Sequence, residues 1–241
     1  MKNAKGISIW QIRTIGGSYG TRPLEYCAER AADAALAAGC NRVDVKAADG
    51  PFAFGKNALT PAIVEIFRRR GLAVWGWGFC YGQNPIGEGQ IAASEVLRLV
   101  LDGWFFDLEG RFEKQSGAEG NARAMLRAFR NLCPTTPAAD CGFAKLWNPE
   151  GWKANNPTTW REWHPAGIHR AALEYLDFGM PMAYWPGSTP AAAERELVAS
   201  FTQWRTLSRK PMLPELRAYT GDGGTVTPEA IIHAGEVARD L

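Results

Sequence analysis

Apolar runs of strand length alternate with stretches of helical periodicity along almost the whole chain. These runs predict seven strands: Gly6–Ile12, Arg42–Ala47, Leu72–Tyr81, Trp104–Glu109, Ala139–Trp147, Phe178–Trp185 and Pro211–Tyr219. Strands that alternate with crossover helices favour a parallel sheet with both faces covered. The sequence therefore predicts an α/β fold.

Seven strand–helix units come close to the eight of a (β/α)8 TIM barrel. We therefore expect a barrel of this type, formed by residues 1–241 as a single domain. The chain ends at Leu241 in a helical pattern, without an obvious eighth strand. The barrel is thus incomplete or irregular, or another element precedes the first strand, or the chain is one piece of a longer protein.

Several helix boundaries can also be predicted. Three helices are expected to begin with threonine at the N-cap and proline at the first helical position, at Thr60-Pro61, Thr189-Pro190 and Thr227-Pro228. Three glycines follow helical runs and are predicted C-caps: Gly39, Gly71 and Gly103.

Composition excludes several functional classes. A net charge of +2 over 241 residues does not favour nucleic acid or an anionic membrane as the main partner. No apolar stretch is long enough for a membrane span, and the N-terminus lacks the apolar region of a signal peptide. We therefore expect cytoplasmic synthesis, of a phage-encoded protein or of part of a larger chain.

Metal and redox chemistry are not indicated either. The five cysteines show no CxxC spacing, which is typical of reduced, buried thiols. The histidines His164, His169 and His233 lack the spacing of zinc ligands. We expect neither a metal nor another cofactor.

The strongest chemical signal is Asp102-Gly-Trp-Phe-Phe-Asp-Leu-Glu109. It is predicted to be a buried strand that carries Asp107 and Glu109 two residues apart, so both acids lie on the same side, because strand side chains alternate. Two adjacent acids cost stability through repulsion and desolvation. Paired carboxylates of unequal pKa are typical of glycoside hydrolysis. The alternative is a solvated strand end, or an acid held by a neighbouring cation.

Other polar and aromatic side chains are predicted at the carboxyl ends of the strands, where barrel enzymes hold their active sites. Period two places Lys46 opposite the valines of its strand, and pairs Glu215 with Arg217 on one face. Tryptophan and tyrosine rings at such positions are typical platforms for sugars. The predicted substrate-binding residues are Gln11, Lys46, Trp77, Tyr81, Lys145, Trp147, Trp185, Glu215 and Arg217.

Four motifs resemble glycoside hydrolase family 25 lysozymes in order: Gly6–Gln11, Val43–Gly50, Gly71–Trp77 and Phe106–Glu109. The resemblance covers about the first half of the chain. The Asp-Gly-x-x-x-Asp-x-Glu run, with Met182-Ala-Tyr184, also resembles family 18 chitinases. Both families are barrels that cleave N-acetylated β-1,4 glycans.

The resemblance implies roles for three residues. Glu109 would donate a proton to the glycosidic oxygen. Asp107 would orient or stabilise the acetamido group as it attacks its own anomeric carbon, and Tyr184 would hydrogen-bond that group. The implied substrate is a polysaccharide or oligosaccharide, such as peptidoglycan or a chitin-like chain.

Two departures from these families leave alternatives open. Ser8 stands where the lysozymes have aspartate, and Phe105 stands where the chitinases have one. Both are compatible with a non-catalytic glycan-binding or phage-tail barrel that descends from a glycosidase. A third alternative is a Schiff-base aldolase that uses Lys46 or Lys145. Its phosphate would need the glycine-rich segment Thr220–Gly224, which otherwise reads as a simple strand-to-helix turn.

Overall fold

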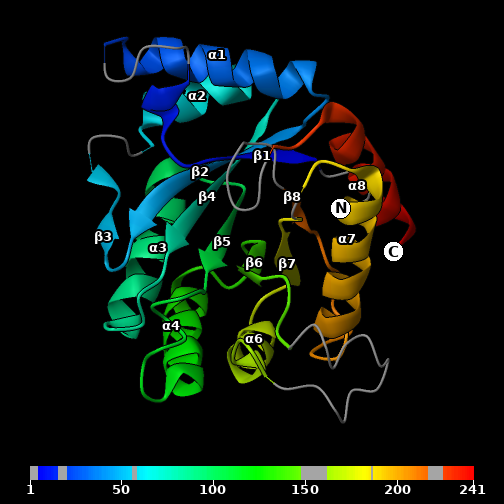
Figure 1. Ribbon diagram of the computed structural model, residues 1–241. Helices are drawn as coiled ribbons and strands as arrows, with labels where there is room; N and C mark the ends of the chain where they lie inside the picture. The colour runs from blue at the N-terminus through cyan, green and yellow to red at the C-terminus, as the bar shows by residue number, and fades with distance from the viewer. Residues whose placement is uncertain (1–4, 16–20, 56–58, 148–161, 186, 217–224) are drawn as a thin grey trace. The chain divides into compact units, whose positions relative to one another are not determined.

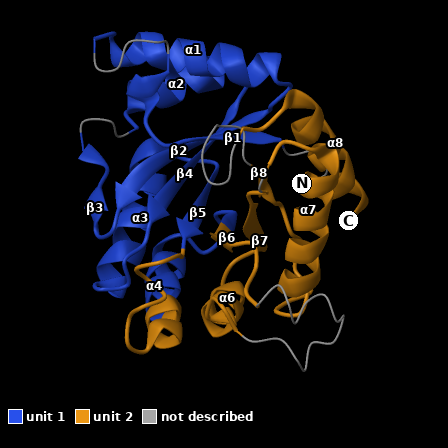
Figure 2. Ribbon diagram, in the orientation of Figure 1, with its two compact units in different colours: residues 1–107, 124–138 blue, residues 108–123, 139–241 orange. Residues whose placement is uncertain are grey.

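The computed structural model describes residues 5–15, 21–55, 59–147, 162–185, 187–216 and 225–241. The chain forms two compact units (Figure 2). The first contains residues 1–107 and 124–138, and the second contains residues 108–123 and 139–241. The prediction of a single domain over residues 1–241 stays a prediction.

The first unit is a parallel sheet with helices packed on it. Its strands are β1 (Gly6–Ile9), β2 (Arg42–Asp49), β4 (Ala73–Phe79) and β5 (Gly103–Asp107), paired in this order. A short strand, β3 (Phe52–Ala53), pairs antiparallel with β2. The helices are α1 (Leu24–Ala37), α2 (Pro61–Arg69) and α3 (Pro85–Leu99), and a 3-10 helix, η1 (Ile12–Thr14), follows β1 (Figure 1).

Strand β2 explains how the sheet separates apolar from polar side chains. Val43, Val45 and Ala47 are fully buried on one face. Arg42, Asp44 and Lys46 alternate with them and take the other face, where Arg42 lies over the Trp75 ring of β4. A valine-rich strand fits between neighbours on both sides because β-branched side chains pack well on a pleated surface.

The second unit repeats the strand–helix alternation. Its strands β6 (Ala138–Phe143), β7 (Phe178–Ala183) and β8 (Glu215–Leu216) are parallel neighbours. Its helices are α6 (Ala166–Leu173), α7 (Pro190–Trp204) and α8 (Pro228–Asp240), while α4 (Ala118–Leu132) has residues in both units. Part of its core is a cluster in which Ala183 and Trp185 pack with α7 and α8.

The predicted fold class is confirmed: the fold is α/β, of the incomplete TIM-barrel type. Each predicted strand has a counterpart, but most end earlier than predicted. The strand predicted at Trp104–Glu109 ends at Asp107, and the one predicted at Ala139–Trp147 ends at Phe143. Strand β2 instead runs two residues further than predicted, to Asp49.

All three predicted threonine N-caps are confirmed. The hydroxyl oxygens of Thr60, Thr189 and Thr227 accept hydrogen bonds from backbone N–H groups three residues later. Gly39 and Gly71 follow their helices with positive φ, as predicted. The prediction for Gly103 is wrong.

Gly103 is the first residue of β5, and Val100 takes the left-handed position that ends α3. A Cβ atom at Gly103 would lie 2.2 Å from the Trp75 ring. The glycine is therefore required by the packing of a neighbouring strand and not by a helix end. Within the described ranges, no helix combines the length and apolar character needed to cross a membrane.

Candidate active site

Two rows of side chains lie near the carboxyl end of the sheet in the first unit. The register of the strands places Lys46, Trp77 and Phe105 in one row. Asp49, Phe79 and Asp107 form the next row. The register between β2 and β4 shifts between Lys46 and Ala48. This irregularity allows Lys46 and Asp49, three residues apart, to reach the same place.

The Lys46 ammonium group lies among a carboxylate and several rings. Its Nζ atom is 2.8 Å from Oδ1 of Asp49 and 4.5 Å from the ring centre of Phe54. The rings of Trp77 and Trp10 lie 5.3 Å and 5.8 Å from the same atom. Such rings attract a cation through their electron-rich faces. The ammonium group of Lys46 thus has a carboxylate counter-ion on one side and aromatic rings on the others.

Tyr81 reaches the same carboxylate from the end of β4. Its hydroxyl group donates a hydrogen bond to Oδ2 of Asp49 over 3.2 Å. Gly50 makes room for the tyrosine, because a Cβ atom there would lie 2.7 Å from the Tyr81 ring. The backbone N–H groups of Tyr81 and Gly82 donate to the buried carboxylate of Glu88. Burial raises the pKa of Glu88, and these backbone donors oppose that rise.

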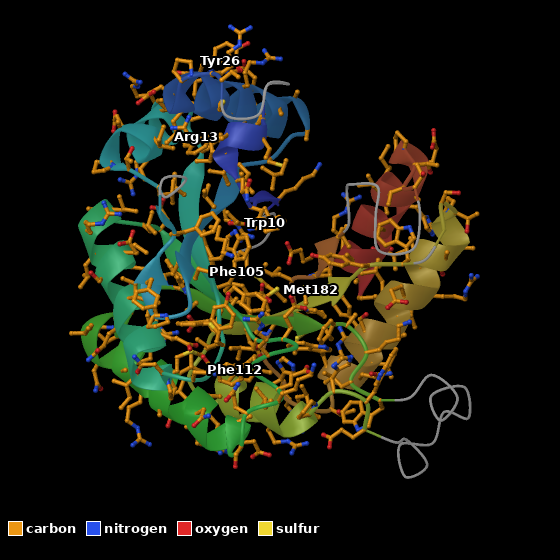
Figure 3. The ribbon with its side chains drawn as sticks, turned by 60° about the vertical axis from the view of Figure 1, so that its left-hand side comes forward. Trp10, Arg13, Tyr26, Phe105, Phe112 and Met182 are labelled. Carbon is orange, nitrogen blue, oxygen red and sulfur yellow. The ribbon has the colours of Figure 1, made fainter. Side chains whose placement is uncertain are left out.

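Trp77 is fixed on two sides. Its ring stacks on Phe105 with centres 5.6 Å apart, and its Nε1 atom donates to the carbonyl oxygen of Ile9. Trp10 follows β1 directly and is 63% exposed, so a ligand can reach it. Figure 3 labels Trp10 and Phe105 of this unit. We call Trp10, Lys46, Asp49, Phe54, Trp77 and Tyr81 the Lys46 cluster.

In the second unit, Glu109 stands two residues after the end of β5 and is half-buried. The N–H group of Leu108 donates to the carbonyl oxygen of Cys141 in β6, which ties this segment to the sheet of its own unit. The carbonyl oxygen of Glu109 accepts from Phe112, so the chain turns immediately afterwards. The predicted strand included Glu109, whereas β5 ends at Asp107, so the strand alternation that was to place the two acids on one side does not reach Glu109.

A second carboxylate of this unit comes from β8. Glu215 accepts a hydrogen bond from Sγ of Cys141 over 3.2 Å. Cys141 pairs in register with Met180, and Met182 pairs with Glu215. Glu215 therefore lies on the same sheet face as Cys141 and Met182. Tyr184, two residues beyond Met182, is half-buried just past the end of β7.

Sequence reasoning missed a histidine–carboxylate pair near the end of β6. Nδ1 of His164 lies 3.0 Å from a carboxylate oxygen of Glu113. The imidazole stacks on Phe143 with ring centres 4.0 Å apart. The carbonyl oxygen of Leu146 accepts hydrogen bonds from the N–H groups of Trp163 and His164. No spacing in the sequence joins Glu113 to His164, because the pair forms only through tertiary structure.

Two predicted binding residues lie where a substrate role is disfavoured. Trp185 is fully buried in the core between β7, α7 and α8, so its ring offers no platform. Lys145 lies beyond the end of β6, and its Nζ atom pairs with Glu196 of α7 at 2.8 Å. Burial raises the pKa of Glu196, and Lys145 opposes that rise.

The remaining predicted residues are placed as follows. Gln11 is half-buried and begins η1 instead of continuing β1. Trp147 is half-buried in an isolated bridge to Glu162. Arg217 and the segment Thr220–Gly224 lie outside the described residues.

In the described part of the chain, neither clusters of possible metal ligands nor the cavity described below indicate another active centre. Among the described residues, no group of three or more His, Cys, Asp or Glu side chains could hold a metal ion. A cavity of about 460 Å³ is lined by residues that include Phe201, Arg209, Met212 and Ala238. Met212 bridges to Gly179, near the amino end of β7. The cavity thus lies near the amino end of β7, whereas Tyr184 lies just past its carboxyl end.

Comparisons with known proteins identify the fold. No family model matches this sequence, and no curated protein matches it. A β-D-glucuronidase of Dictyoglomus thermophilum has a TM-score of 0.65 at 14% identity, covering 99% of this chain and 42% of its own. XacCel5A has a TM-score of 0.56 at 13% identity, covering 98% of each chain.

A GH18 chitinase from Pseudoalteromonas aurantia has a TM-score of 0.51 at 14% identity, covering 73% of this chain and 72% of its own. The fold is one that glycoside hydrolases use. At these identities the likeness concerns the fold alone.

Proposed function

We propose that this protein is a glycoside hydrolase that cleaves β-1,4-linked N-acetylated amino-sugar polymers, of the peptidoglycan or chitin type. The observation that carries the proposal is Glu109, which stands just after the end of β5 in a fold that glycosidases use. A carboxyl group at this end of a barrel strand is suited to protonating a glycosidic oxygen. The lysozyme or muramidase type rests on the sequence resemblance alone.

In this proposal, Glu109 is the general acid. Asp107, two residues earlier in the chain, orients the acetamido group of the sugar as it attacks the anomeric carbon. Tyr184 hydrogen-bonds that group. Such substrate assistance replaces the usual second carboxylate.

Glu215 is the alternative second carboxylate. Glycosidases commonly use a pair of acids, one as proton donor and the other as nucleophile or base. Glu215 belongs to the same unit as Glu109, and the Cys141 thiol hydrogen-bonds its carboxylate. The two mechanisms differ in the sugar they require, since only the first needs an acetamido group.

The experiment is a reducing-end assay on chitotetraose and cellotetraose with the wild type, E109Q, D107N and E215Q. The proposal predicts cleavage of chitotetraose and a loss of about 10²-fold or more in E109Q. Substrate assistance predicts a large loss in D107N and no cleavage of cellotetraose. A loss confined to E215Q and E109Q would instead identify Glu215 as the second carboxylate.

A matched control distinguishes loss of the catalytic group from an unspecific effect of replacing glutamate by glutamine. Glu119 lies in the first turn of α4 and its side chain is 57% exposed, so E119Q makes the same chemical change outside the site. We expect E119Q to keep wild-type activity. Full activity in E109Q would refute the proposal.

A non-catalytic glycan-binding protein is the second candidate. One observation favours it: Phe105, where the chitinase pattern has an aspartate, is buried and stacks on Trp77. That position therefore has an apolar packing role. Glycan affinity without release of reducing ends over the same panel would support this candidate.

A further inference from the structure

The Lys46 cluster combines an exposed ring with a fixed, partly exposed carboxylate. Trp10 is 63% exposed as a residue, and the Asp49 side chain is 39% exposed. Beneath them, the Lys46 side chain is only 7% exposed. A buried lysine that served only to neutralise Asp49 would not need the exposed tryptophan next to it. The open side of the cluster therefore suits a ligand.

The hydrogen bonds on Asp49 leave its carboxylate able to accept more. Oδ1 faces Lys46 at 2.8 Å, and Oδ2 accepts from the Tyr81 hydroxyl at 3.2 Å. Each carboxylate oxygen has about two acceptor directions, so each can accept one further hydrogen bond. Two neighbouring acceptors held in a fixed orientation match two neighbouring hydroxyl groups. The exposed face of Trp10 matches the apolar face of a sugar ring.

The charges of the cluster define which sugar fits. Lys46 already has Asp49 as its counter-ion, so the pair carries no net charge. An acidic sugar would bring its carboxylate close to Asp49, and like charges at a binding surface oppose association. A neutral sugar avoids this repulsion and still satisfies the two acceptors.

We propose that the Lys46 cluster is a binding subsite for an uncharged sugar residue. Trp10 stacks on the ring, and Asp49 accepts hydrogen bonds from its hydroxyl groups. Lys46 and Tyr81 are positioning residues that hold the Asp49 carboxylate. The proposal rests on the proposed function for the class of ligand, and it names neutral glycans over acidic ones.

The test is isothermal titration of the full chain carrying E109Q, with chitotetraose as the neutral probe and tetragalacturonate as the acidic one. Chitotetraose should bind and tetragalacturonate should bind at least about tenfold more weakly. W10A and D49N should each weaken chitotetraose binding at least about tenfold. W10F keeps an aromatic ring, so its affinity for chitotetraose should fall less than that of W10A.

D49N should also reduce the preference for the neutral probe, because it leaves the Lys46 charge unmatched. The control is D33N, which makes the same change at a carboxylate that pairs with Arg70 and is 42% exposed. D33N should bind like the parent. Because Trp10 is exposed, W10A tests the subsite even if D49N fails to fold.

Parental affinity in both W10A and D49N would overturn the subsite, as would absence of chitotetraose binding or a preference for tetragalacturonate. The wild-type reducing-end assay keeps the two proposals apart. Cleavage with an unchanged KM in W10A would refute the subsite proposal and support the hydrolase proposal. Binding that depends on Trp10 and Asp49, without any cleavage by the wild type, would support the subsite proposal and refute the hydrolase proposal.

Discussion

Asp140 of β6 and His169 of α6 are fully buried, with Nδ1 of His169 3.0 Å from a carboxylate oxygen of Asp140. The imidazole fits there because residue 142 is glycine: a Cβ atom would lie 2.2 Å from the ring. Burial raises the pKa of Asp140, against the influence of His169. Burial alone would lower the pKa of His169, but the carboxylates of Asp140 and Glu113 together outweigh burial and raise that pKa.

This pair predicts a pH dependence of stability. The pKa of His169 is raised above 6.5 in the folded state, so its protonation contributes fully to folding stability below pH 6.5. The contribution is lost as the pH rises through the raised pKa. The raised pKa of Asp140 acts with the same sign. Melting temperatures of the wild type at pH values on both sides of 6.5 should therefore fall toward alkaline pH.

In the double variant D140N/H169Q, the melting temperature should depend much less on pH. H233Q is the control, because His233 pairs with Glu194 but is partly exposed, with 34% of its side chain accessible. It should keep the wild-type slope. Equal slopes in the wild type and the double variant would show that the buried pair does not set the pH dependence.

At the scale of elements, helix starts could be predicted because their signals are local. Thr189 with Pro190 contains the N-cap and the first helical residue of α7, and the structure has both. Gly103 was assigned wrongly because its role depends on Trp75, a residue from another strand. The predicted ends of β5 and β6 were too late because apolar character continues into the turns that follow.

The candidate site was predictable only in part for the same reason. Lys46 was predicted from strand periodicity, and Tyr81 and Trp77 as rings near a strand end; the structure brings all three together in the Lys46 cluster. Asp49 was missed because the irregularity of β2 breaks the period of two on which the prediction depended. The burial of Trp185 could not be predicted, because a tryptophan at a strand end can face the ligand or the helices, and periodicity does not distinguish these faces.

The caps also carry a stability prediction. T189V removes the hydroxyl oxygen that accepts from the N–H group of Ala192 and should lower the free energy of unfolding by about 1 kcal/mol. T202V is the matched control in the same helix, because the Thr202 hydroxyl bonds only back to Val198. That contact adds little to helix stability. Urea unfolding of both variants measures their free energies of unfolding. Equal losses in T189V and T202V would contradict a stabilising role of the Thr189 cap.

At the scale of the whole molecule, the two proposals place sugar binding at the Lys46 cluster and proton donation at Glu109, which belong to different units. The first unit contains the Lys46 cluster, which we propose as a sugar-binding subsite. The second contains Glu109, Glu215 and Tyr184, which can donate protons or stabilise charge. Fold likeness to glycosidases applies to the chain as a whole. Binding and cleavage should therefore be separable by mutation.

The central claim is that Glu109 donates a proton to the leaving group. The most direct measurement compares E109Q with the wild type on chitotetraose and on the 2,4-dinitrophenyl glycoside of N-acetylchitobiose, whose leaving group needs no proton. The account predicts a loss of about 10²- to 10⁴-fold on chitotetraose and a much smaller loss on the activated glycoside. Equal losses on both substrates, or no loss on chitotetraose, would contradict it.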